Sequence, residues 1–430
     1  MTTNPNVGKT AFRPMAICCG LFFILGFITW ANGTLIPFLK IACNLETDLQ
    51  AFFVTFASYI AYFFLALPSS VIIKKIGFQN GLVVSLIILG LGSLIFIPAA
   101  DNRSYGLFLT GIFIQGSGMA LLQTAVNPYL SIIGPIDSAA QRISIAGFFN
   151  KSAGIIVPIL FGTLFLKDAQ KVTAKLEATT DLVQKNAILD DLLQRVHTPY
   201  ISLAIIFVAF AIFLKFTHLP EVDVDAEEET SEENGIVAVK KTSIFQYPHL
   251  FLGALAIFFC VAVEVMAGDI IGVYARELKV DPFFTTYATA FTLSCMLIGY
   301  IIGIISIPRF VSQQMALRIC TIIGITFTVI SVFTTGTTSF IFVALLGIAN
   351  SLMWPAIFPL GIKGLGKFTK TGSAIMIMGI AGGAVWPLIY GLLKDHLHID
   401  FQHAFLYAMV PGYLYIMYFS IAGHKVGKTN

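Results

Sequence analysis

Twelve apolar segments run along this chain, and each is long enough to cross a lipid bilayer as a helix. About 20 consecutive apolar residues span the hydrocarbon core. Helices satisfy their own backbone hydrogen bonds in lipid, which leaves few other folds open to such a chain. We therefore expect an all-α membrane protein with twelve transmembrane helices. The segments lie at residues 15–39, 49–73, 79–99, 107–130, 143–166, 199–216, 247–275, 283–307, 314–335, 338–362, 370–393 and 402–424.

The composition excludes a soluble protein. Of the 430 residues, 57% are hydrophobic and 11% are charged, and a soluble chain of this length needs far more polar surface. The sequence contains no Walker A phosphate loop, no zinc-ligand spacing and no nucleophile arrangement. We therefore expect a protein of the lipid bilayer that is not an enzyme, with no cofactor and no nucleic-acid partner.

The distribution of positive charge predicts the orientation in the membrane. If both termini lie in the cytoplasm, thirteen Lys and Arg residues fall on the inner side and five fall in the short outer loops. Cytoplasmic loops of membrane proteins carry the excess of positive charge. The sequence therefore predicts that the N- and C-termini are both cytoplasmic.

An acidic stretch divides the chain into two halves. Residues 221–233 hold eight acids in thirteen positions, and such a stretch cannot bury itself in a core. We expect a cytoplasmic linker at residues 217–246. It would join a bundle of six helices at residues 1–216 to a second bundle at residues 247–430.

The two halves repeat each other. A Gly-x3-Pro-x3-Gly pattern occurs in the fifth and eleventh segments, and each copy follows a proline that has a glycine six residues on. The offsets between the copies, 229 and 227 residues, nearly agree, which indicates duplication. Two parallel six-helix repeats around a midplane site are the architecture of the major facilitator superfamily. The repeated positions are Gly154, Pro158 and Gly162 with Gly383, Pro387 and Gly391, and Pro128 and Gly134 with Pro355 and Gly361.

Longer blocks resemble one family within that superfamily. Residues 125–134, 142–154 and 355–391 are similar to the fucose–proton symporter family of bacterial sugar transporters. The blocks FNKSAG at 149–154 and VEVMAGD at 263–269 resemble its branch of glucose/galactose or N-acetylglucosamine transporters.

The resemblance implies a monomeric transporter of the bacterial inner membrane that works by alternating access. It would import a monosaccharide, a neutral hexose or N-acetylhexosamine of the glucose, galactose, mannose or N-acetylglucosamine type. Uptake would be symport with a cation, and sodium and the proton both remain open. An uncoupled facilitator of the same fold and a membrane sensor that binds sugar without moving it are the alternatives.

The match departs from the family at two positions. Fucose transporters of this family use one carboxylate in the first helix and another in the fourth. The matching positions here are Gly33 and Gln123, and neither residue can carry a proton. The departure therefore argues against coupling by that route and against L-fucose as the substrate, and coupling in this chain would need another acid.

Glu264 and Asp269 are the candidates for that acid, because they lie inside an apolar run where a lone charge costs several kcal/mol. Five residues of ideal helix turn through about 500°, so the two side chains would point roughly 140° apart. Gly268 could allow the seventh helix to break and bring both acids to one cavity, as in other transporters. We expect these two residues to form the ion-coupling site, with sodium as one candidate ligand. The alternative is that one acid forms a structural pair with a basic side chain or stays protonated.

Polar side chains within other spans are candidates for sugar binding. Lys151 lies about nine residues from the nearer end of its helix, too deep for its ammonium to reach water easily. Gln123 and Asn127 share one helix face, and Asn32 and Asn150 add further amides suited to sugar hydroxyl groups. Hydrogen bonding between helices is the alternative role for these amides.

Two tryptophans complete the expected binding site. Trp354 and Trp386 each precede a proline, and both lie away from the depth at which aromatic residues usually line membrane surfaces. Aromatic rings bind the apolar face of a pyranose, so we expect both in the sugar site. Packing in the protein core is the alternative.

Overall fold

The computed structural model describes residues 7–133, 138–165, 169–217 and 242–427, and these ranges contain helices and no strand. Twelve helical segments are long and apolar enough to cross a membrane, so the predicted number of spans is confirmed. Most of the expected acidic linker, residues 218–241, lies outside the described residues.

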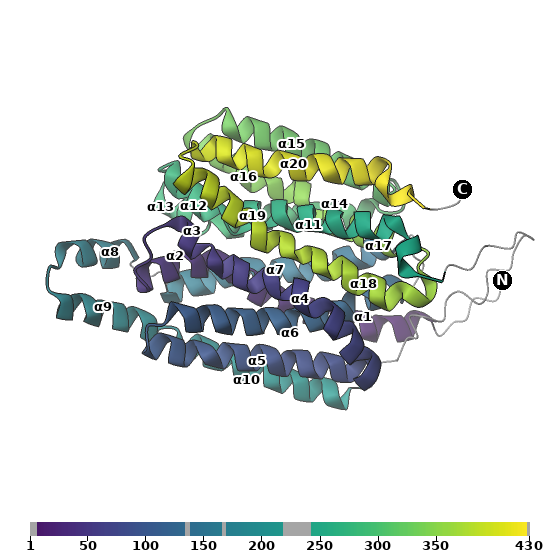
Figure 1. Cartoon of the computed structure of the whole chain (residues 1–430), viewed down its shortest axis with the longest axis horizontal. Coiled ribbons are helices and arrows are strands. Elements are labelled where there is room, and N and C mark those ends of the chain that lie inside the picture. Colours follow the sequence, from purple (N-terminus) through teal and green to yellow (C-terminus); the bar gives the residue numbers. More distant parts are fainter. Residues whose placement is uncertain (1–6, 134–137, 166–168, 218–241, 428–430) are drawn as a thin grey trace, which may run out of the picture.

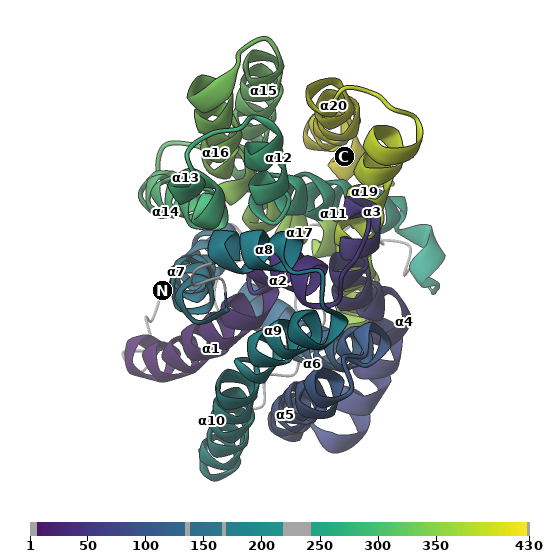
Figure 2. The same cartoon turned by 90° about the vertical axis from the view of Figure 1, so that its left-hand side faces the viewer.

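The helices form two bundles that lie side by side, as Figures 1 and 2 show from two directions. The N-terminal bundle is drawn in purple to teal and the C-terminal bundle in green to yellow. The N-terminal bundle contains α1 (Val7–Thr29), α2 (Asn32–Ala42), α3 (Asp48–Ala51), α4 (Phe53–Ile76), α5 (Phe78–Asp101), α6 (Tyr105–Ile132), α7 (Ala139–Phe165), α8 (Ala169–Ala178), α9 (Leu182–Gln194) and α10 (His197–Phe216).

The C-terminal bundle begins after the short helix η2 (Ile244–Gln246). Across the interface between the bundles, α7 packs against α14, and α4 packs against α18 and α19. The C-terminal bundle contains α11 (Pro248–Gly268), α12 (Ile271–Glu277), α13 (Pro282–Thr286), α14 (Ala288–Ser306), α15 (Gln313–Val332), α16 (Gly336–Ser351), α17 (Met353–Ile362), η3 (Gly366–Phe368), α18 (Thr369–Met378), η4 (Gly379–Ala381), α19 (Gly382–Gly391), η5 (Leu392–His396), α20 (Phe401–Ile421) and η6 (Gly423–Lys425).

The first span of each bundle is broken, and the two breaks meet. α1 and α2 are separated at Trp30, and α11 ends at Gly268 as the sequence predicted. A Cβ atom on Gly268 would run into the indole ring of Trp30, so only glycine allows this close approach. On the other side, the Thr289 hydroxyl donates to the Gly268 carbonyl (2.7 Å) and Thr292 donates to the Ala267 carbonyl (2.8 Å). These donors satisfy backbone carbonyls at the break.

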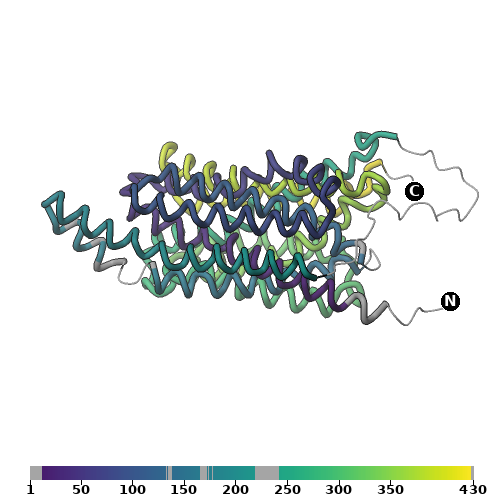
Figure 3. The backbone as a smooth tube through the Cα atoms, turned by 90° about the horizontal axis from the view of Figure 1, so that it is seen from below, coloured from purple at the N-terminus to yellow at the C-terminus, as the bar shows by residue number. Residues whose placement is uncertain are grey.

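The two ends of the molecule differ. At one end, α8 and α9 extend beyond the bundle (Figures 1 and 3), and we call this the hairpin end. Arg103 holds α9 there, with its guanidinium donating to Asp190 (2.6 Å) and Asn186 (2.7 Å). α1 begins and α20 finishes at the opposite end, which we call the terminal end.

Candidate functional site

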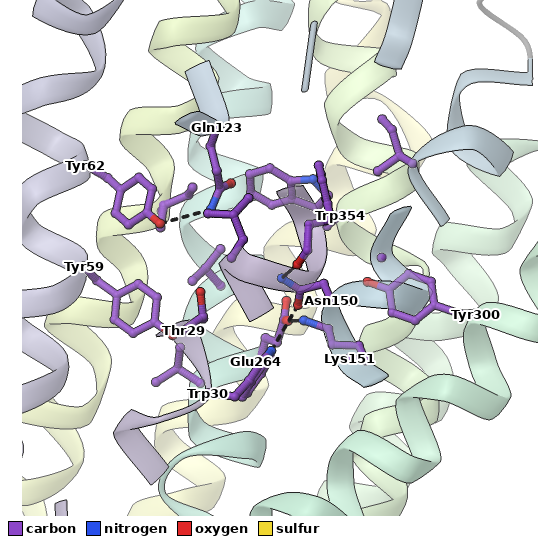
Figure 4. A pocket seen from close by; sticks show the side chains of 17 residues that line it. Thr29, Trp30, Tyr59, Tyr62, Gln123, Asn150, Lys151, Glu264, Tyr300 and Trp354 are labelled. Atoms are coloured by element: carbon purple, nitrogen blue, oxygen red, sulfur yellow. Dashed lines mark hydrogen bonds and ion pairs between the residues drawn. The ribbon is translucent and has the colours of Figure 1, made fainter. Parts of the chain in front are cut away.

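A cavity lies between the two bundles. The space between atoms there is about 670 Å³, including the part that is open to solvent. Figure 4 shows side chains from both bundles pointing into it. The lining residues are Phe22, Leu25, Thr29, Trp30, Tyr59, Tyr62, Gln123, Ile143, Gly147, Asn150, Lys151, Val261, Glu264, Val265, Tyr300, Trp354 and Ile380.

An ion pair crosses the cavity from one bundle to the other. Nζ of Lys151 on α7 lies 2.5 Å from Oε1 of Glu264 on α11, and the two side chains are 7% and 12% exposed. Lys151 thus lines the cavity, which is the inward position expected for it. A buried pair of this kind is stable only while both partners are present.

Trp30 connects this ion pair to an amide. The Lys151 ammonium lies 4.2 Å from the centre of the Trp30 ring, which is within the range of a cation–π interaction. The Trp30 indole N–H donates to Oδ1 of Asn150 (3.1 Å), and the Asn150 amide donates to the carbonyl of Phe22 (3.2 Å). Lysine, indole and amide therefore form one connected wall of the cavity.

A second polar group lies on the opposite wall (Figure 4). The Gln123 amide donates to the Tyr62 hydroxyl (3.0 Å), and Tyr62 stacks on Tyr59 with ring centres 6.5 Å apart. Asn127 is fully buried behind Gln123 and donates to its backbone carbonyl (3.1 Å), so it does not line the cavity. The two amides that reach the cavity from α6 and α7 are Gln123 and Asn150.

Asp269 lies next to the cavity without lining it. The residue is 1% exposed, and its carboxylate interacts with the Tyr59 hydroxyl and with the backbone N–H of Gly33. Oδ1 lies 3.4 Å from the position that a Cβ atom on Gly33 would take, and Tyr59 interacts with the carboxylate electrostatically. Tyr59 also lines the cavity, so it connects Asp269 with the cavity wall. Asn32, one residue before Gly33, is buried and does not line the cavity.

The two tryptophans selected from the sequence have different surroundings. Trp354 lines the cavity and stacks on Phe358 with ring centres 5.7 Å apart. Trp386 does not line it: its indole donates to the carbonyl of Ala408 (2.5 Å), and its ring packs edge-on against Phe258 and Phe259. The structure therefore gives Trp386 the alternative role, packing within the C-terminal bundle.

Glu264 and Asp269 have different surroundings in the structure. Glu264 faces the cavity, and the Lys151 ammonium occupies the position beside it that sodium would need. Within the described ranges, no group of three or more His, Cys, Asp or Glu side chains could hold a metal ion. Asp269 is the acid with no cation beside it in an ion pair.

Sequence reasoning did not select Trp30, Tyr59, Tyr62 or Tyr300 for the site. Tyr59 and Tyr62 are three residues apart in an apolar helix, and this spacing puts their hydroxyl-bearing rings on one face. A pair of tyrosines within a span, away from the membrane surfaces, was the available signal.

Two six-helix bundles around a polar cavity are the architecture of a class of membrane transporters. In agreement, residues 18–390 match the family model of the Major Facilitator Superfamily, and the chain belongs to this superfamily. The expected fold is thereby confirmed, and the protein is a transporter rather than an enzyme.

Individual relatives cover nearly the whole chain. A glucose/galactose transporter of Brucella abortus biovar 1 (strain 9-941) is 34% identical over 408 residues, covering 94% of this chain and 92% of that protein. The L-fucose-proton symporter of Escherichia coli (strain K12) is 30% identical over 386 residues, covering 89% of this chain and 87% of the symporter. The structure superposes on the crystal structure of FucP in the outward conformation with a TM-score of 0.76 and 28% identity, covering 96% and 98% of the two chains.

Proposed function

We propose that this protein imports a neutral hexose or N-acetylhexosamine across the bacterial inner membrane by alternating access. One observation carries the proposal: the two charged side chains that line the cavity, Lys151 and Glu264, neutralise each other. A cavity without net charge favours an uncharged ligand, since a charged one would be buried without a counterion. The amides of Gln123 and Asn150 supply hydrogen bonds for hydroxyl groups, and Trp354 supplies a flat apolar face.

The relatives support a sugar as the ligand. The Brucella protein is named a glucose/galactose transporter and the Escherichia coli protein an L-fucose-proton symporter. We propose a hexose of the glucose and galactose type, because 34% identity to the former exceeds 30% to the latter.

We propose the proton as the coupling cation and Asp269 as the group that carries it. An ionised carboxylate with no ion-pair partner costs several kcal/mol in this environment, so burial of Asp269 favours its protonated form. Contact with water in another conformation would allow the proton to leave. Tyr59 interacts with Asp269 and also lines the cavity, so it would make the fit of the sugar depend on the charge at Asp269.

The orientation completes the proposal. With the terminal end in the cytoplasm, as the positive charges indicate, the hairpin end faces the outside of the cell. We expect the protein to act as a monomer, because each chain contains a complete cavity between its own two bundles.

Uptake into proteoliposomes tests this function. Radiolabelled glucose, galactose, L-fucose and N-acetylglucosamine would be supplied with a pH gradient and a sodium gradient imposed separately. We expect accumulation of at least one hexose when the outside is acidic, and no accumulation from sodium alone. Accumulation that needs sodium would reject the proton, and equilibration insensitive to both gradients would favour the uncoupled facilitator. Sugar binding without flux would favour the sensor.

Trp354→Ala is expected to raise the Kd for the sugar about tenfold, equivalent to a loss of ~1.4 kcal/mol, because the ring faces the cavity. Trp386→Ala is the matched control, since this indole packs inside one bundle. It should lower thermal stability and leave the sugar Kd unchanged. Tryptophan fluorescence or calorimetric titration of the purified variants measures the sugar Kd of each. Equal effects of the two substitutions on sugar affinity would show that Trp354 does not contact the sugar.

A further inference from the structure

A cluster of six charged side chains closes the interface between the bundles at the hairpin end. At its centre, the Asp48 carboxylate is 5% exposed and contacts three cations. Arg276 on α12 donates to both oxygens (2.8 Å each), Lys394 on η5 lies 2.6 Å from Oδ2, and Lys40 on α2 contacts Oδ1. Asp48 and Lys40 belong to the N-terminal bundle, whereas Arg276 and Lys394 belong to the C-terminal bundle.

Two further acids balance the cluster. Glu277 lies 3.0 Å from the Lys394 ammonium, and Oδ2 of Asp395 accepts from the backbone N–H of Leu49 (3.0 Å). The latter bond joins the first turn of α3 to η5 and is a second link between the bundles. Three acids and three bases leave the cluster without net charge.

An apolar layer supports the charges. The rings of Phe52 and Tyr390 lie 6.3 Å apart across the interface. A Cβ atom on Gly391 would approach the side chains of Phe52 (3.0 Å) and Leu49 (3.1 Å), so α3 lies directly against the end of α19. Figure 2, which looks onto the hairpin end, shows α3 beside α19.

We propose that this cluster is the gate that closes the hairpin end of the transporter, with Asp48 as its latch. No path can open between the bundles at this end while Asp48 holds Arg276 and Lys394 together. The charges suit a reversible gate: they pair when it is closed and are hydrated when it is open, so neither state leaves a charge unsatisfied. The inference rests on the alternating access of the proposed function and does not depend on which sugar or cation is carried.

Accessibility of a cysteine in the cavity tests the gate. Thr29→Cys, at a residue that lines the cavity, would be introduced into a full-length chain whose six native cysteines are replaced. A membrane-impermeant maleimide is then added from the hairpin side of oriented vesicles. With Asp48→Asn we expect the labelling rate to rise about tenfold, as for a population shift of ~1.4 kcal/mol. Labelling from the terminal side should fall.

The matched control is Asp190→Asn, which breaks an ion pair with Arg103 at the same end but within one bundle. It should leave the labelling rate unchanged. Arg276→Met and Lys394→Met each remove one partner from the C-terminal bundle and should increase labelling in the same direction. They test the gate even if Asp48→Asn fails to fold.

Two results would overturn the gate: unchanged labelling in every folded variant of Asp48, Arg276 and Lys394, or an equal increase in the Asp190→Asn control. Because labelling needs no sugar, the outcome is separate from that of the uptake assay. Increased labelling in a protein that moves no sugar would support the gate and reject the proposed transport. Sugar uptake with an unchanged labelling rate would support the proposed transport and reject the gate.

Discussion

Asp269→Asn is expected to abolish accumulation of sugar driven by a pH gradient while leaving exchange of sugar across the membrane intact. The amide has nearly the shape of the protonated acid, so the buried position next to Gly33 stays filled. It cannot release a proton, and so the return step no longer depends on pH. Proton-driven uptake and counterflow, measured in the same proteoliposomes, separate the two activities.

An exposed acid provides the control for this experiment. Asp101→Asn removes a carboxylate that is paired with His197 at the surface, and it should leave both activities unchanged. Full pH-driven accumulation by Asp269→Asn would show that the proton is carried elsewhere.

Moving the carboxylate provides a second check. The double variant Gly33→Asp with Asp269→Gly should regain part of the coupling, because the new side chain starts 3.4 Å from the position of the original oxygen. The Thr289 hydroxyl, which lies closest to that position, would have to turn away.

Neutralising one partner of the Lys151–Glu264 pair is expected to abolish uptake and to destabilise the protein. Lys151→Met leaves the Glu264 carboxylate buried without a counterion, and Glu264→Gln leaves the ammonium in the same position. Removing one member of a buried pair costs about 3–5 kcal/mol. The double variant Lys151→Met with Glu264→Gln leaves neither charge, so it should recover most of the thermal stability.

Uptake by the double variant separates a structural role from a binding role. We expect no recovery of uptake, because the sugar loses charged hydrogen-bonding partners in the cavity. Arg103→Met and Asp190→Asn are the matched controls, since that pair is exposed and such pairs contribute at most about 1 kcal/mol. Recovery of full uptake by the double variant would assign the pair to stability alone.

Much of the fold could be predicted from local pattern. The length of each apolar segment predicted its span, and the repeated glycine and proline positions predicted two related bundles. Gly268 indicated the break in α11, because a glycine between two acids in an apolar run allows the helix to break there. The break between α1 and α2 at Trp30 was not predicted, although the Asn32-Gly33 dipeptide that follows it is a local signal for a break.

Part of the site was predictable for the same reason. Gln123, Asn150, Lys151 and Glu264 all line the cavity, as expected of polar side chains that cannot face lipid. The aromatic residues were harder: nothing in the sequence separates Tyr300 from the other 13 of 14 tyrosines, because these rings are accepted in lipid, in a core or in a cavity.

The sequence alone was sufficient to predict a twelve-helix membrane protein. It also identified the polar residues that must avoid lipid, because the free-energy cost of exposing a side chain to hydrocarbon depends on that side chain alone. Which of those groups pair with each other was set by the folded structure. Lys151 lies 113 residues from Glu264, and Asp48 lies 346 from Lys394. Coulomb energy depends on distance in space, and neither distance exists until the two bundles pack together.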